Sequence, residues 1–186
     1  MDAHRADASG QAFFAEPSRN RITVAAFLNF FIAWESFLEN TIVELMTGGA
    51  TVSGSSPTKF IAPVDASSAR GLIIGINRYF DYGNHDNVRK MVRMYFRDGY
   101  PYEPHLSSIA SDLADLRTLR NSSAHITSTT QTALEGLAQR ILSRPWPDVN
   151  LYSLLTAADP RATTGETVYS SYKNRLIVAA ELIVTG

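Results

Sequence analysis

The chain has 186 residues, a formal net charge of −1, 45% hydrophobic residues and 19% charged residues. This length and composition predict one globular domain with a real core, and the near-neutral charge argues against coating nucleic acid over the whole surface. The sequence has no cysteine, which excludes disulfides, thiolate catalysis and zinc sites built on cysteine.

The N-terminal segment does not resemble a targeting sequence. It carries Asp2 and Asp7 early and has no apolar core segment, unlike a signal peptide. The longest apolar run, from Val24 to Trp34, contains Asn29 and is too short to span a bilayer. We therefore expect a cytoplasmic protein that does not contact a membrane.

The first half of the chain predicts a long helix followed by a loop. We expect residues 1–16 to form a flexible lead-in and residues 17–186 to form a single helical domain. From Arg19 to Thr47 the apolar residues recur at three- and four-residue spacing, which predicts the longest helix. Gly48 and Gly49 end that helix. Residues 48–64 are small, polar and punctuated by proline, so they predict a loop that is either mobile or functional.

The rest of the chain predicts further helices. Apolar spacing and capping residues indicate helices over about 67–81, from Asn84 or Asp86 to the Gly99 region, and from Pro104 to about Arg120. Capping boxes at Ser128-x-x-Gln131 and Thr132-x-x-Glu135 predict a helix over 129–143. A short element at 151–157 and a final helix over 165–184 follow. No alternating strand pattern is longer than a few residues, so the fold class is all-α, a bundle of about five to six helices.

The sequence lacks the residue patterns that are typical of metal and cofactor sites. The four histidines (His4, His85, His105 and His125) have no second ligand at helical or zinc-type spacing. Glu35 and Glu39 lie four residues apart, but no Glu-x-x-His partner exists for a di-iron bundle. The glycine patterns of nucleotide-binding loops are also absent. We expect neither a metal site nor a cofactor.

A basic stripe lies in the predicted third helix. Arg89, Arg93 and Arg97 are four residues apart, which places them on one helix face, opposite the apolar stripe. One interpretation is a surface that contacts the phosphates of RNA. The other is an ordinary solvated helix face.

The segment from Asp115 to His125 combines an arginine with a nearby histidine. Arg120 lies four residues after Leu116 and seven after Leu113, so the spacing predicts that it faces inward. Asn121 and two serines favour a helix end there, which would let His125 turn back toward Arg120. The alternative is an arginine–asparagine pair that makes local caps, with His125 on the surface.

Two motifs resemble one known family. Arg120-Asn121-x-x-x-His125 resembles the Arg-x4–6-His signature of the HEPN superfamily (higher eukaryotes and prokaryotes nucleotide-binding domains), in which a polar residue follows the arginine. The run from Trp34 to Glu39, with Glu35 as its first carboxylate, is similar to the Trp-Glu-x-Phe-x-Glu run of small stand-alone prokaryotic members. A helical bundle agrees with that fold.

A second pair in the chain also fits the spacing of that signature. Arg78 and His85 are seven residues apart, but the residue after Arg78 is Tyr79, whereas a polar residue is typical of the family. The segment around Arg120 is therefore the better match.

The resemblance implies a metal-independent endoribonuclease that acts as a homodimer, with two copies of the motif forming one composite site. His125 would be the general acid or base, Arg120 would hold the scissile phosphate, and Asn121 would orient the phosphate or the histidine by hydrogen bonds. Attack by the ribose 2′-hydroxyl would leave a 2′,3′-cyclic phosphate. Glu35 would be either a more distant partner of Arg120 or an ordinary carboxylate on the helix surface.

The resemblance also implies a biological setting and leaves alternatives open. Toxin–antitoxin, antiviral and stress-response systems contain such proteins, and an antitoxin or a nucleotidyltransferase is a common partner. The alternatives are a non-catalytic HEPN-like module that binds a nucleotide or a protein, and a plain helical oligomerisation domain.

Overall fold

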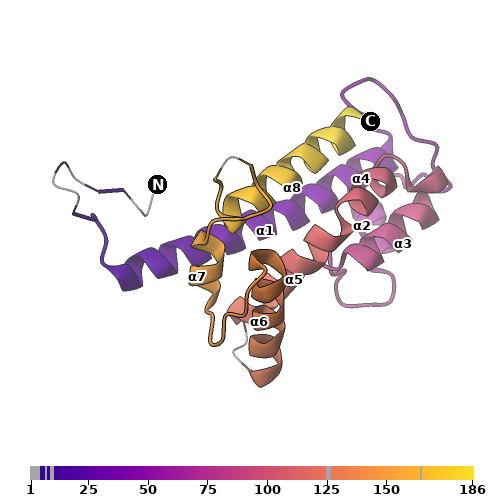
Figure 1. The fold of residues 1–186 in the computed structure, drawn as a ribbon. Helices are drawn as coiled ribbons and strands as arrows, with labels where there is room; N and C mark the ends of the chain where they lie inside the picture. Colours follow the sequence, from indigo (N-terminus) through magenta and orange to yellow (C-terminus); the bar gives the residue numbers. More distant parts are fainter. Residues whose placement is uncertain (1–4, 7, 9–10, 125–126, 164) are drawn as a thin grey trace. The chain divides into compact units, whose positions relative to one another are not determined.

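The computed structural model describes residues 5–6, 8, 11–124, 127–163 and 165–186, and Figure 1 shows its fold. This part of the chain contains helices and three isolated β-bridges but no strand. The all-α prediction is thereby confirmed. The helices are α1 (Glu16–Thr47), α2 (Ala66–Ile74), α3 (His85–Tyr95), the 3-10 helix η1 (Arg97–Gly99), α4 (Tyr102–Ser108), α5 (Ala110–Ala124), α6 (Ser128–Leu142), α7 (Leu151–Thr156) and α8 (Val168–Thr185).

Contacts divide the chain into two compact units. The first unit contains Met1–Ile32 and Thr118–Ser171, and the second contains Ala33–Arg117 and Tyr172–Gly186. Each unit combines segments that are far apart in the sequence, so no single linker separates them. The expectation of a single domain over residues 17–186 remains a prediction.

Helix α1 is the longest element, as predicted, and it ends at Gly48, whose φ of +113° favours glycine. By length and composition alone α1 could cross a membrane, a test that the core helix of a soluble protein also passes. One side of α1 is buried at the spacing of a helix face, so the absence of membrane contact remains our expectation. The buried apolar residues of α1 are Phe27, Phe31, Trp34, Leu38, Ile42, Val43, Leu45 and Met46.

The first unit is held together by aromatic packing and by one enclosed carboxylate. Tyr169 meets the rings of Phe27 and Phe30 edge-on, each at 6.3 Å between ring centroids. Asp159, whose side chain is fully enclosed, accepts hydrogen bonds from Nε and Nη2 of Arg161 at 2.9 and 2.8 Å. This bidentate pair shapes the turn between α7 and α8.

In the second unit, two acidic residues join the first half of α5 to α8. Asp112 accepts from Arg175 at 2.5 Å, and the buried Asp115 accepts from the Tyr172 hydroxyl at 2.7 Å. Because both acceptors lie one turn apart on α5, the pair of bonds sets how α5 is rotated about its own axis.

Several boundaries differ from the sequence predictions. Helix α2 ends at Ile74, before Gly75 with φ +60°, so the predicted helix over 67–81 is too long. A helix over 67–81 would place Ile76 and Tyr79 on its apolar face, but in the structure they are 104% and 74% exposed. The predicted helix from Pro104 to Arg120 is two helices, because Ile109 leaves helical geometry at φ −115° and ψ 20°. This split and the short α7 raise the number of α-helices in the described residues above the predicted five to six.

The start of α6 is correct to one residue, but its cap is not the one predicted. Thr127 and Thr130 form the capping box by reciprocal side-chain to main-chain bonds. Gln131 and Glu135 have another role. The Gln131 amide donates to Glu135 at 2.9 Å, and Glu135 accepts from the main chain of Asp148 at 2.9 Å. These bonds fasten the proline-containing link that follows α6.

The Asp159–Arg161 pair predicts a specific dependence of stability on pH. Burial alone would raise the pKa of Asp159, but hydrogen bonds from Arg161 and Ser171 and the charge on Arg161 lower it to about 2. Since the folded pKa lies below the ordinary value, the stabilisation is complete above pH 4 and is lost as the pH falls toward 2. We expect Asp159→Asn to lower the free energy of unfolding at pH 7 by about 2 kcal/mol.

Urea unfolding of wild type and Asp159→Asn at several pH values measures this effect. The difference between the two should shrink as the pH falls from 4 toward 2. The exposed Asp148 provides the control substitution, Asp148→Asn, which should change stability little. A difference that stays constant down to pH 2 would contradict the assignment.

Candidate functional site

Arg120 and Asn121 lie on α5, in the first unit. The Arg120 guanidinium donates to the Asn121 side-chain oxygen at 3.3 Å, and Arg120 is exposed. The prediction that Arg120 faces the core is therefore wrong.

The angular position of Arg120 on α5 does not account for this exposure. Leu113, Leu116 and Leu119 are all at most 3% exposed, and they form the buried side of the helix. At about 100° per residue, Arg120 lies about 20° around the helix from Leu113 and about 40° from Leu116, so it falls on that same side. Its exposure shows that the described residues do not cover this side near the end of α5.

Helix α5 does not end at Asn121 as predicted but continues to Ala124. The serine hydroxyls bond back to the helix instead of interrupting it: Ser122 donates to the Thr118 carbonyl at 2.8 Å, and Ser123 donates to the Arg120 carbonyl at 2.6 Å. His125 lies outside the described residues, so its predicted approach to Arg120 remains a prediction.

Glu35, the predicted distant partner of Arg120, is half-buried on α1. It belongs to the second unit, whereas Arg120 and Asn121 belong to the first. Its pairing with Arg120 remains a prediction.

Two arginines of the basic stripe are held by one carboxylate within the second unit. Arg89 donates to Glu103 through Nε at 3.2 Å and through Nη2 at 2.8 Å, and Arg93 donates to the same carboxylate. Ser107 adds a bond to Glu103 at 2.7 Å. Glu103 is only 9% exposed, so the two arginines enclose it and join α3 to α4. The stripe is therefore neither a free cationic surface nor a fully solvated helix face.

Arg97 does not share the helix face of Arg89 and Arg93, contrary to the prediction. Helix α3 ends at Tyr95, and Arg97 begins η1, where its side chain is exposed. Phe96, between them, has extended backbone angles of −122° and 143°. This break in the helix ends the four-residue periodicity, so Arg97 is the member of the stripe most available to an external anion.

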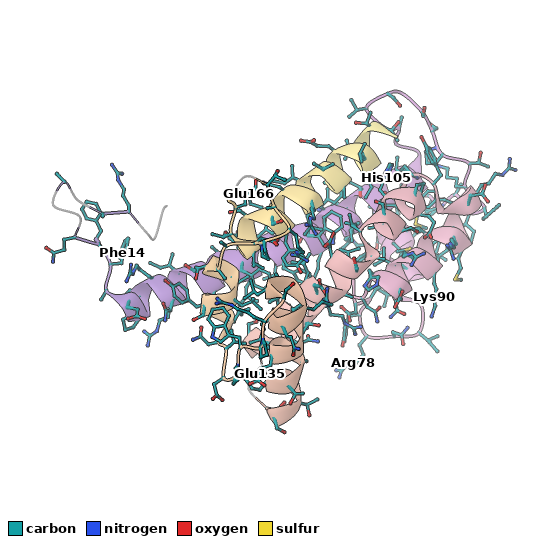
Figure 2. The ribbon with its side chains drawn as sticks, viewed as in Figure 1. Phe14, Arg78, Lys90, His105, Glu135 and Glu166 are labelled. Carbon is teal, nitrogen blue, oxygen red and sulfur yellow. The ribbon has the colours of Figure 1, made fainter. Side chains whose placement is uncertain are left out.

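The second arginine–histidine pair lies in a different setting. Arg78 is exposed in the segment between α2 and α3, where Figure 2 labels it. His85 opens α3 with its side chain 13% exposed, and its Nε2 lies 3.6 Å from Asp86. Both residues belong to the second unit, and Tyr79 beside Arg78 supplies no amide or carboxylate.

Over the described residues, no group of three or more histidine, aspartate or glutamate side chains could hold a metal ion. The sequence matches no known protein-family model and no curated protein, and the fold matches no solved structure. The function must therefore be inferred from the residues themselves.

The Glu103 cluster gives a prediction about stability. Burial raises the pKa of Glu103, but hydrogen bonds from Arg89 and Ser107 and the charges of Arg89 and Arg93 lower it below its ordinary value. We expect Glu103→Gln to lower the free energy of unfolding by about 1.5–3 kcal/mol at pH 7, because both guanidinium groups lose their anionic acceptor. This loss should shrink as the pH falls through the lowered pKa of the folded state, because the wild-type carboxylate then takes up a proton.

Chemical denaturation of Glu103→Gln beside Glu181→Gln, an exposed position on α8, isolates the cluster from a general effect of charge removal. Equal stabilities of the two variants at pH 7 would refute a structural role for Glu103.

Proposed function

We propose that this chain is a metal-independent endoribonuclease of the HEPN type. The proposal rests on the motif that begins at Arg120 and on the all-α fold, which agrees with the resemblance. The observation that supports it most is that the Arg120 guanidinium, bonded to Asn121, is exposed to solvent. An exposed arginine beside an amide suits bidentate binding of a phosphate group.

In the proposed reaction, Arg120 binds the scissile phosphate and stabilises the negative charge that grows in the transition state. Asn121 keeps the guanidinium oriented through its side-chain oxygen. His125 takes the proton from the ribose 2′-hydroxyl or gives one to the leaving 5′-oxygen, since an imidazole pKa lies near neutral pH. The products are a 2′,3′-cyclic phosphate and a free 5′-hydroxyl.

The proposal includes a homodimer with two motifs in one composite site. Exposure of Arg120 in a single chain suits a site that is completed by a second copy and by RNA. In that arrangement the guanidinium loses its water only when a phosphate replaces it, which avoids the cost of burying an unpaired cation.

We infer that Arg97, exposed on η1, is the cation of the basic stripe that contributes to RNA binding. Arg89 and Arg93 would contribute less, because Glu103 already neutralises part of their charge. An antitoxin or nucleotidyltransferase partner in a toxin–antitoxin, antiviral or stress-response system belongs to the same proposal.

The test is RNA cleavage in the presence of EDTA. We expect the wild-type protein to cut total RNA and to leave DNA intact, and His125→Ala to lower the rate by about two to four orders of magnitude. Arg120→Ala should lower it by about two to three orders of magnitude. Sedimentation should assign the activity to a dimer.

Matched controls are available on the same and neighbouring helices. Arg117→Ala removes an arginine one turn before Arg120 on α5, and His105→Ala removes a histidine from α4. Both variants should cleave RNA at nearly the wild-type rate. Cleavage that requires a metal ion, a fully active His125→Ala protein, or a fully active monomer would each overturn the proposal. Intact binding of RNA with no cleavage by any form would favour the non-catalytic binding module.

A further inference from the structure

The second unit contains a cavity of about 360 Å³ beside the C-terminal turns of α1 and α8. Its volume lies within the range of small-molecule sites, and its surface is mostly apolar. None of its lining residues belongs to the proposed nuclease site. The lining residues are Asn40, Thr41, Glu44, Leu45, Ala50, Thr51, Tyr102, Ile183 and Val184.

One wall of the cavity is the beginning of the 48–64 loop, which the sequence marks as mobile or functional. The loop is fastened on both sides. The Val52 amide donates to the Val184 carbonyl of α8 at 2.8 Å. The Lys59 ammonium donates to the carbonyls of Leu45 and Met46 at 3.4 and 3.1 Å, at the end of α1. The loop is therefore held against α1 and α8 by hydrogen bonds to their main-chain carbonyls, and it forms a defined wall of the cavity.

Tyr102 lines this cavity and carries a buried hydroxyl. Its side chain is 0% exposed, and its ring packs on Phe96 with 5.9 Å between centroids. Its hydroxyl meets no hydrogen-bond partner of acceptable geometry in the described part of the chain. Burial raises the pKa of the phenol, so the hydroxyl stays protonated and is a hydrogen-bond donor at neutral pH.

Thr41 adjoins that hydroxyl and lowers the pKa of Tyr102 slightly, but it does not satisfy the donor. The Thr41 hydroxyl donates to the main-chain carbonyls of Phe37 at 2.8 Å and Leu38 at 3.3 Å. A buried phenol without a hydrogen-bond partner lowers the free energy of unfolding, because the hydroxyl gives up its hydrogen bond to water on folding and gains none in the folded chain. A ligand oxygen that accepts from Tyr102 would remove this cost.

The formal charges of the lining residues indicate which class of ligand the cavity can bind. Among the described residues that line the cavity, Glu44 alone carries a formal charge at pH 7, and it is negative. The cavity therefore disfavours carboxylates and phosphates. We propose that it binds a small, mostly apolar and neutral molecule with one hydrogen-bond-accepting oxygen, such as a ketone, whose oxygen accepts from the Tyr102 hydroxyl.

Titration calorimetry with heptan-2-one, and with heptanoate as the anionic probe, tests the proposal on the full-length chain. Heptan-2-one should bind with a stoichiometry of one, and heptanoate at least about tenfold more weakly, since it brings a charge beside Glu44. Tyr102→Phe keeps the ring but removes the donor, so it should weaken the binding of heptan-2-one by about two- to tenfold. The same variant should melt about 2–4 °C higher without ligand, because the unsatisfied hydroxyl is gone.

A variant that fills the cavity tests whether heptan-2-one binds there or at another surface. Ala50 is exposed at the cavity wall, so Ala50→Trp should abolish the binding of heptan-2-one while the protein stays folded. Ser56→Trp, in the same loop but outside the lining, should bind normally. Absence of heptan-2-one binding to wild type, equal binding of ketone and carboxylate, or unchanged affinity in Tyr102→Phe or in Ala50→Trp would overturn the proposal. The readout is binding, so the result does not depend on RNA cleavage.

Discussion

The exposure of Arg120, on a side of α5 that is otherwise buried, is the feature on which the candidate nuclease site depends. Leu113 and Leu116 lie within about 40° of Arg120 around the helix, and both are at most 3% exposed. Arg120 itself is exposed and donates to the Asn121 side-chain oxygen at 3.3 Å. Its guanidinium therefore keeps hydrogen-bond donors that face solvent.

The exposure of Arg120 distinguishes it from the arginines of α3, which pair with a carboxylate of the same chain. A partly buried guanidinium needs an anionic partner within the chain, as Arg89 has in Glu103. Arg120 instead keeps its donors for solvent and for Asn121. Arginine thus has a structural role on α3, where Glu103 pairs with it. On α5 we propose that Arg120 binds an external phosphate instead.

The sequence predicts the fold well where the pattern is local. The buried stripes of α3 and α8 agree with their apolar spacing, because each helix carries an uninterrupted three- and four-residue repeat. Ile76, Tyr79 and Arg120 are predicted to be inside but are exposed, because burial depends on which segments cover a helix face and where the helix stops. The pairing of Arg89 with Glu103 was not predictable, since the partners lie 14 residues apart on different helices.

In the proposed function, RNA is cut by attack of its own 2′-hydroxyl in a site that contains Arg120 and His125. The most direct measurement uses one RNA oligonucleotide with a mapped cleavage position and a second with a single 2′-deoxy nucleotide on the 5′ side of that bond. The account predicts a 2′,3′-cyclic phosphate product from the first and no cut at that bond in the second. Cleavage of the 2′-deoxy bond, or a product with a 5′-phosphate, would contradict it.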